Sequence, residues 1–104
     1  MAVTSKALAR TAAATSSATL YTVPSTSIVT IVTNIAVTNT AASAATFTIA
    51  IDGVAIQSGS SLAANSSAYI DLKQVIPANA TPKTITGFAS ATTVNFHISG
   101  VEIS

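Results

Sequence analysis

The sequence predicts an all-β domain. We expect an antiparallel β-sandwich, jelly-roll or immunoglobulin-like, of about seven or eight short strands with an N-terminal arm. Apolar and polar residues alternate with a period of two in several segments, and many of the apolar ones are β-branched. Turn-forming residues recur at intervals of about 8–12 positions, as between short strands. A small closed barrel is the alternative, which strand number and loop length favour less than the sandwich.

The longest alternating segment, residues 27–39, is expected to be the central strand around which the domain packs. Its odd positions, expected to face the core, are Val29, Ile31, Thr33, Ile35 and Val37. Its even positions include the apolar Ile28 and Val32. That side of the strand therefore also needs a cover, from the N-terminal arm, a second sheet or another subunit.

The residues before the central strand divide into an arm and a short strand. Residues 1–18 are rich in Ala, Thr and Ser without a helical apolar stripe, and we assign them to an extended arm on the domain or on a neighbour. A short helical turn at residues 6–14 is the alternative, although an isolated helix of that length is marginal in water. Hydroxyl residues interrupt the apolar run that a signal peptide needs. The sandwich domain is assigned to residues 19–104, and its first strand ends at Pro24.

A hairpin is predicted immediately after the central strand. Residues 46–51 place Phe47, Ile49 and Ile51 on one face. The dipeptide Asp52-Gly53 then favours a two-residue turn, because a type I′ turn needs positive φ at both positions. The chain returns through residues 54–56, and the Ser- and Asn-rich residues 57–67 are expected to be a loop.

Three further strands complete the predicted domain. Residues 68–73 point Ile70 and Leu72 inward, and a proline-containing bend leads to a strand at 83–89. In the last strand, residues 93–103, the inward residues are Val94, Phe96 and Ile98. The apolar residues then change parity to Val101 and Ile103, which predicts a β-bulge near Gly100.

The composition indicates a protein made for contact with other proteins. Charged residues are 7% of the chain and the net charge is +1, whereas an ordinary soluble domain has about 25% charged residues. Binding to nucleic acid needs a clustered basic face, which is absent. No apolar run approaches the roughly 18 residues of a membrane-spanning helix. A neutral surface of Ser, Thr, Asn and Ala can pack against a neighbour without desolvating ions.

No motif for catalysis, a cofactor or a metal ion is present. The chain has no cysteine and one histidine, His97, which points away from the inward residues of its strand. No serine has the context of a nucleophile elbow, so we interpret His97 as a surface or interface residue. The three carboxylates lack the spacing of a calcium loop. Tyr21 and Tyr69 could form a sugar-stacking platform, although packing is the commoner role of aromatic residues.

Five residues are the candidates for an interface with another subunit. They are the apolar, aromatic and imidazole side chains Ile28, Val32, Tyr21, Tyr69 and His97.

Several sequence elements, taken in order, resemble the small β-sandwich virion proteins of tailed bacteriophages. They are Leu20-Tyr21-Thr22-Val23-Pro24, Val37-Thr38-Asn39, Ala44-Ala45-Thr46-Phe47-Thr48-Ile49, Ile76-Pro77-Ala78-Asn79 and the ending from Ala91 to Ile103. The resemblance covers residues 20–104. It implies a non-enzymatic structural role in the virion, on the capsid, neck or tail, and it carries over no site residues.

We expect a capsid decoration (cement) subunit that works as a small oligomer. Its partners would be further copies of itself and major capsid or tail proteins, with no cofactor, nucleic acid or membrane. It would be assembled in the host cytoplasm and reside in the virion. The alternatives are a tail, collar or fibre-attached structural module and a carbohydrate-binding module.

Overall fold

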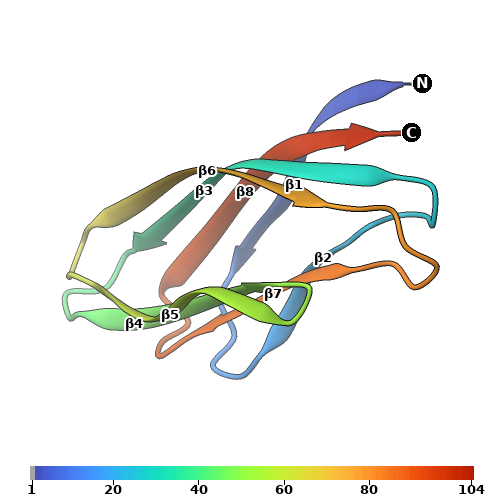
Figure 1. Ribbon diagram of the computed structural model, residues 1–104. Helices are drawn as coiled ribbons and strands as arrows, with labels where there is room; N and C mark the ends of the chain where they lie inside the picture. The colour runs from blue at the N-terminus through green and yellow to red at the C-terminus, as the bar shows by residue number, and fades with distance from the viewer. Residues whose placement is uncertain (1) are drawn as a thin grey trace.

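The computed structural model describes residues 2–104, which form eight strands and no helix (Figure 1). The strands are β1 (Val3–Ala12), β2 (Ala18–Thr22), β3 (Val29–Asn39), β4 (Ala45–Ile51), β5 (Val54–Leu62), β6 (Ser67–Ile76), β7 (Thr84–Ala89) and β8 (Val94–Ile103). They form two four-stranded antiparallel sheets. Sheet A has the order β1-β8-β3-β6, and sheet B has the order β2-β7-β4-β5. Across this range there is no helix that could cross a membrane.

The strand order is that of a jelly roll. Consecutive strands lie in opposite sheets except for the β4–β5 hairpin. Eight strands in two sheets linked this way make two Greek keys, whereas an immunoglobulin domain has a different order. No strand pairing joins the two sheets within residues 2–104, so the barrel alternative is wrong and the antiparallel sandwich is confirmed.

The core lies between the sheets. The largest fully buried apolar side chains are Phe96, Ile35, Ile49, Ile76, Ile85, Ile98, Val32, Val37 and Val94. The rings of Phe47 and Phe96, from opposite sheets, meet edge to face with their centroids 6.4 Å apart. The inward faces predicted for β4 and for the first half of β8 are confirmed, because alternation places every second side chain between the sheets.

The β4–β5 turn is also as predicted. Asp52 and Gly53 have φ values of 55° and 75°, the two positive angles of a type I′ turn. The Asp52 carboxylate lies 3.2 Å from the Lys83 ammonium, across the start of β7. The predicted loop at residues 57–67 is wrong in extent, since β5 runs on to Leu62. Gly59, at φ 57°, sits in a bulge that lets this polar strand continue along β4.

The prediction for the central strand is half wrong. In the first half of β3 the even-numbered residues Thr30 and Val32 are buried. In the second half the odd-numbered residues Ile35 and Val37 are buried instead. The parity changes because Thr33 is an extra residue relative to β8, between the pairs Val32–Gly100 and Asn34–Ser99. A bulge of one residue turns every later side chain to the other face. The first odd residues, Val29 and Ile31, therefore face outward.

The bulge predicted near Gly100 is not in β8 itself. β8 pairs without interruption through Gly100. The extra residues are Thr33 in β3, opposite the Ser99–Gly100 step, and Leu8 in β1, opposite the Ile98–Ser99 step. Every second residue of β8, from Val94 through Gly100 to Glu102, therefore faces inward. Val101 and Ile103, predicted to turn inward, share the outward face instead.

Residues 3–12, assigned to an arm, form the edge strand β1, which pairs with β8 and contributes Leu8 and Ala9 to the core. The alternative of a helical turn at residues 6–14 is wrong. Pairing with β8 satisfies the backbone groups on one side of this segment, whereas an isolated helix of this length is only marginally stable. The backbone of Ala2 exchanges two hydrogen bonds with Ser104, so both ends of the described chain lie together (Figure 1).

All four edge strands are irregular. β1, β2, β5 and β6 each carry at least one residue more than the neighbouring strand at a register shift. Bulges interrupt the row of free backbone groups that an edge strand would offer to another strand. The edges of this domain are therefore poor templates for strand addition, and its two outer faces are the better surfaces for contact.

Candidate interaction surface

The described residues, 2–104, enclose no pocket, and they bring no three potential metal ligands together. The features that a partner could contact lie on the outer faces of the two sheets. On each face the strand register places side chains in rows that run across the sheet.

One end of the outer face of sheet A is apolar. The first row there joins Val3, Ile103 and Val29. The next row joins Ser5, Val101, Ile31 and Val75. The six apolar members of these rows, Val3, Val29, Ile31, Val75, Val101 and Ile103, are called the valine patch below. Val3 is 63% exposed and Val75 57% exposed, and the other four are partly exposed. No charged residue belongs to either row.

The other end of the same face is polar. One row joins Arg10, His97, Ala36 and Tyr69, and the row between it and the valine patch ends at Asp71 on β6. Arg10, His97 and Tyr69 are exposed, with Tyr69 the most exposed large apolar side chain at 73%. Asp71 accepts a hydrogen bond of 3.2 Å from Asn34. Arg10 and Asp71 thus lie on the two opposite edge strands of the sheet.

The outer face of sheet B has a different character. Its outward residues are mainly threonines: Thr19, Thr22, Thr46, Thr48, Thr84 and Thr86. The large exposed apolar side chain of this sheet is Val54, at 69%, which lies beside the β4–β5 turn and pairs with the inward Ile51. Phe88 is only partly exposed. This face is neutral and hydrogen-bonding, whereas sheet A offers both apolar and charged contacts.

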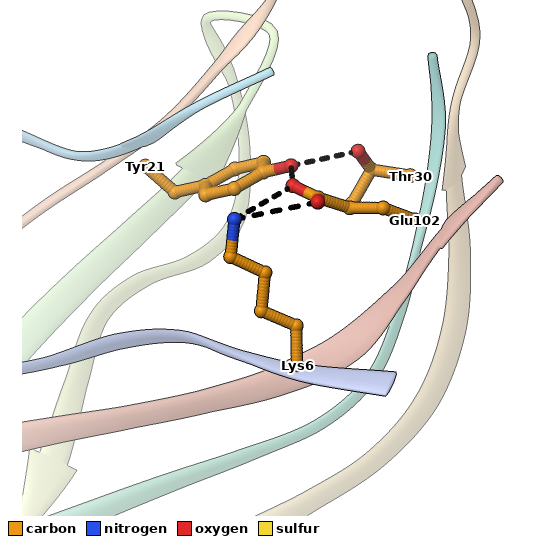
Figure 2. Close-up of polar contacts among 4 residues, drawn as sticks. All are labelled: Lys6, Tyr21, Thr30 and Glu102. Atoms are coloured by element: carbon orange, nitrogen blue, oxygen red, sulfur yellow. Dashed lines mark hydrogen bonds and ion pairs between the residues drawn. The ribbon is translucent and has the colours of Figure 1, made fainter. Parts of the chain in front are cut away.

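A polar cluster of Lys6, Tyr21, Thr30 and Glu102 joins the two sheets (Figure 2). The Tyr21 hydroxyl, from β2, lies 2.9 Å from the Thr30 hydroxyl and donates a 2.5 Å hydrogen bond to Glu102. The Lys6 ammonium, from β1, is 3.3 Å from the Glu102 carboxylate, which is 12% exposed. One inward carboxylate thus links β1, β2 and β8, because tyrosine and lysine supply the donors that its burial requires.

The cluster makes stability depend on pH in the alkaline range. Burial, followed by the hydrogen bond to Glu102, raises the pKa of Tyr21 from 10.0 to about 12. Since the folded-state pKa lies above the unfolded one, this stabilisation is complete below pH 10 and disappears as the pH rises through 12. We therefore expect the urea midpoint to fall more steeply between pH 10 and 12 for wild type than for Tyr21→Phe.

Wild type and Tyr21→Phe differ in no other ionisable group, so the difference between the two curves isolates Tyr21. Parallel curves for wild type and Tyr21→Phe would contradict the assignment.

The five interface candidates separate into two groups. Val32 has no exposed surface and Tyr21 is 7% exposed, so neither can meet a partner in this structure. Val32 is buried because it precedes the Thr33 bulge, where the even-numbered residues of β3 face inward. The polar cluster holds Tyr21 between the sheets. Ile28 is partly buried against the core. Tyr69 and His97 lie in one row of the outer face of sheet A, and their place in an interface stays a prediction.

The carbohydrate platform proposed for Tyr21 and Tyr69 is wrong, because only Tyr69 is exposed. Asp71 and Lys73, two residues apart on β6, form no ion pair in the described part of the chain, and Asn34 donates a hydrogen bond to the Asp71 carboxylate.

Sequence reasoning missed Glu102 and the valine patch for the same reason. The apolar residues of the last strand change from even to odd positions after Gly100. This pattern predicts a bulge in that strand, which would turn Val101 inward, whereas the bulge lies in the neighbouring strands. A signal was present, because Glu102 is in phase with Phe96 and Ile98, and Tyr21 is in phase with the apolar Val23. A tyrosine and a carboxylate at inward positions of neighbouring strands are a pair that can be buried together.

Comparison with known proteins gives a likeness in fold alone. No family model and no curated protein matches the sequence. Among solved structures, a chain of the T13 particle of infectious bursal disease virus matches with a TM-score of 0.54 at 11% identity, covering 97% of this chain and 30% of that one. A chain of the VP2 subviral particle of the same virus matches with a TM-score of 0.50 at 16% identity, covering 97% and 31%. The present chain therefore spans less than a third of these viral chains.

Proposed function

We propose that the chain is a non-enzymatic structural protein of a virus particle, acting as a decoration subunit on the capsid of a tailed bacteriophage. The observation that carries the proposal is the combination of a jelly roll with a low overall charge, 7% of the residues, and a threonine-rich outer face on sheet B. Jelly rolls occur in viral capsids, and the viral chains described above share the fold. The ordered sequence elements that resemble phage virion proteins support the proposal of a phage rather than another virus.

The proposed mechanism is contact area. Burying apolar surface contributes about 25 cal/mol per Å², so a few hundred Å² gives several kcal/mol before the cost of association. Neutral hydroxyl and amide groups can be desolvated with less loss than charged groups. Repetition over a symmetric shell then multiplies each weak contact.

The proposal predicts that antibodies against the purified protein label the capsid surface of particles from cultures that express this chain. Electron microscopy of the labelled particles is the measurement, with pre-immune serum as the control. Label confined to the tail or collar would favour the alternative of a tail-associated module. Purified particles that contain none of the chain would overturn the virion role altogether.

A further inference from the structure

We propose that the outer face of sheet A binds the same face of a second copy of this chain. The two-fold axis would run parallel to the strands, between β8 and β3. The proposal rests on the proposed function for its biological role and deepens it by naming the partner and the surface. It follows from the row arrangement of this face, from its charges, from its area and from the state of the edge strands.

The rows become self-complementary under this rotation. Turning the sheet over about an axis along its strands keeps each row at its own height and places β8 of one copy over β3 of the other. Val101 then faces Ile31 of the second copy, and Ile103 faces Val29, because each pair shares a row. All four side chains are apolar and partly exposed. The valine patch is thus covered by an identical patch, as an isologous interface requires.

The charges become complementary under the same rotation. The edge strand β1 comes to lie over the opposite edge strand, β6. Arg10 then faces the exposed ring of Tyr69 in its own row, with Asp71 one row away. One row is two residues, or about 6.6 Å along a strand, which is within reach of an arginine side chain. A guanidinium can stack on the tyrosine ring and pair with the carboxylate, and symmetry makes this contact twice.

The rest of the face matches in the same way. His97 meets Ala36 of the second copy, and Ser99 meets Asn34. Polar residues thus meet small or polar residues. The two Arg10 side chains lie at opposite ends of their shared row, and the two Asp71 side chains at opposite ends of theirs, because β1 and β6 are the two edges of the sheet. The exposed Lys73 has no partner in any row, because it lies in the β6 bulge between Asp71 and Gln74. A rotation about an axis across the strands would instead stack β1 on β1, and it would leave Arg10 far from Asp71.

The face is large enough for a stable contact. Ten residues at about 3.3 Å and four strands at about 4.8 Å give a projected face of roughly 600 Å². Two such faces bury roughly 1,200 Å², the lower limit for specific protein interfaces. Packing of one sheet on another is also the arrangement that the domain itself uses. Strand addition is disfavoured because all four edges carry bulges.

Sedimentation equilibrium of the whole chain tests the proposal. We expect wild type to dimerise reversibly at concentrations up to about 1 mM, as an interface of this size should. Ile31→Asp is expected to weaken the dimer by about a hundredfold or more, because it buries a charge in the valine patch. The matched control is Thr86→Asp, which places the same charge on a middle strand of sheet B and should leave the dimer unchanged.

A charge exchange tests the two-fold axis itself. Arg10→Asp and Asp71→Arg should each weaken the dimer by about tenfold, and the double variant should return to within about threefold of wild type. Both side chains are exposed, so these variants should fold even if Ile31→Asp does not, and circular dichroism checks this. Wild type that stays monomeric, an unaffected Ile31→Asp dimer, or a double variant as weak as the single ones would overturn the proposal.

The outcomes also separate this inference from the virion role. Labelled capsids together with a monomeric protein would contradict the dimer and support the proposed function. A protein that dimerises with the charge-exchange pattern but is absent from particles would support the interface and contradict the proposed function.

Discussion

Replacing Gly100 by alanine is expected to lower the free energy of unfolding by about 3 kcal/mol or more. A Cβ at this position would collide with the backbone carbonyl oxygen of Ile31 and would lie 2.8 Å from Cδ1 of Leu8. Both groups belong to the strands that pair with β8 on its two sides, β1 and β3. The Leu8 side chain could turn aside, but the carbonyl belongs to a central strand and can move only if β3 moves.

Chemical denaturation of the two proteins measures this effect, and its thermal counterpart is a fall in Tm of roughly 12 °C or more. Ser99→Ala is the matched control, because Ser99 is the preceding residue of β8 and is exposed. That control should stay within about 0.5 kcal/mol of wild type. A Gly100→Ala protein as stable as the control would show that the Ile31 carbonyl does not crowd Gly100 as described.

Asn39→Asp is the second substitution with a large expected effect. Asn39 is fully buried at the end of β3, and its side-chain NH₂ lies within hydrogen-bond distance of the carbonyls of Ser43, Leu62 and Ala63, at 2.8, 3.5 and 3.3 Å. Its side-chain oxygen accepts from the Ala41 amide and the Thr93 hydroxyl. One amide thus connects three loops of the sandwich.

A carboxylate in place of that amide would set an oxygen against three carbonyl oxygens. We expect a loss of about 3 kcal/mol or more at neutral pH, because the donors disappear and a buried charge takes their place. Protonation would restore one donor, so the loss should shrink as the pH falls toward about 4. Denaturation at several pH values measures this dependence.

The control for Asn39→Asp is Asn95→Asp. Asn95 lies on the adjacent strand at an outward position that needs no buried donor. Its substitution should change stability by no more than about 0.5 kcal/mol. Equal losses at both positions would mean that the loop connections of Asn39 contribute little.

The elements of the fold could largely be predicted because most of them follow local rules. Phe47, Ile49 and Ile51 alternate with polar residues, and Asp52-Gly53 suits only a tight turn, so the hairpin was found together with its turn type. The N-terminal segment was harder, because its Ala and Thr residues have no strong period. Its backbone groups find partners only when β8, about ninety residues later, is in place.

The candidate surface could not be predicted in the same way. Tyr69 and His97 were correctly placed on outward positions, since their neighbours in sequence are inward. Val32 and Tyr21 were misplaced because bulges and cross-sheet hydrogen bonds depend on strands that are distant in sequence. The pairing of Arg10 with Tyr69 and Asp71 in the proposed dimer is likewise invisible until the register of three strand pairs is known.

By itself, the sequence determined the antiparallel sandwich, its hairpin and the low charge of its surface, because alternation, turn chemistry and composition act within a few residues. Only the tertiary structure decided which face of β3 is buried and that Glu102 points inward while Val101 and Ile103 point outward. The physical reason is that a β-bulge reverses every side chain beyond it. Whether a strand takes up a bulge depends on the strands beside it.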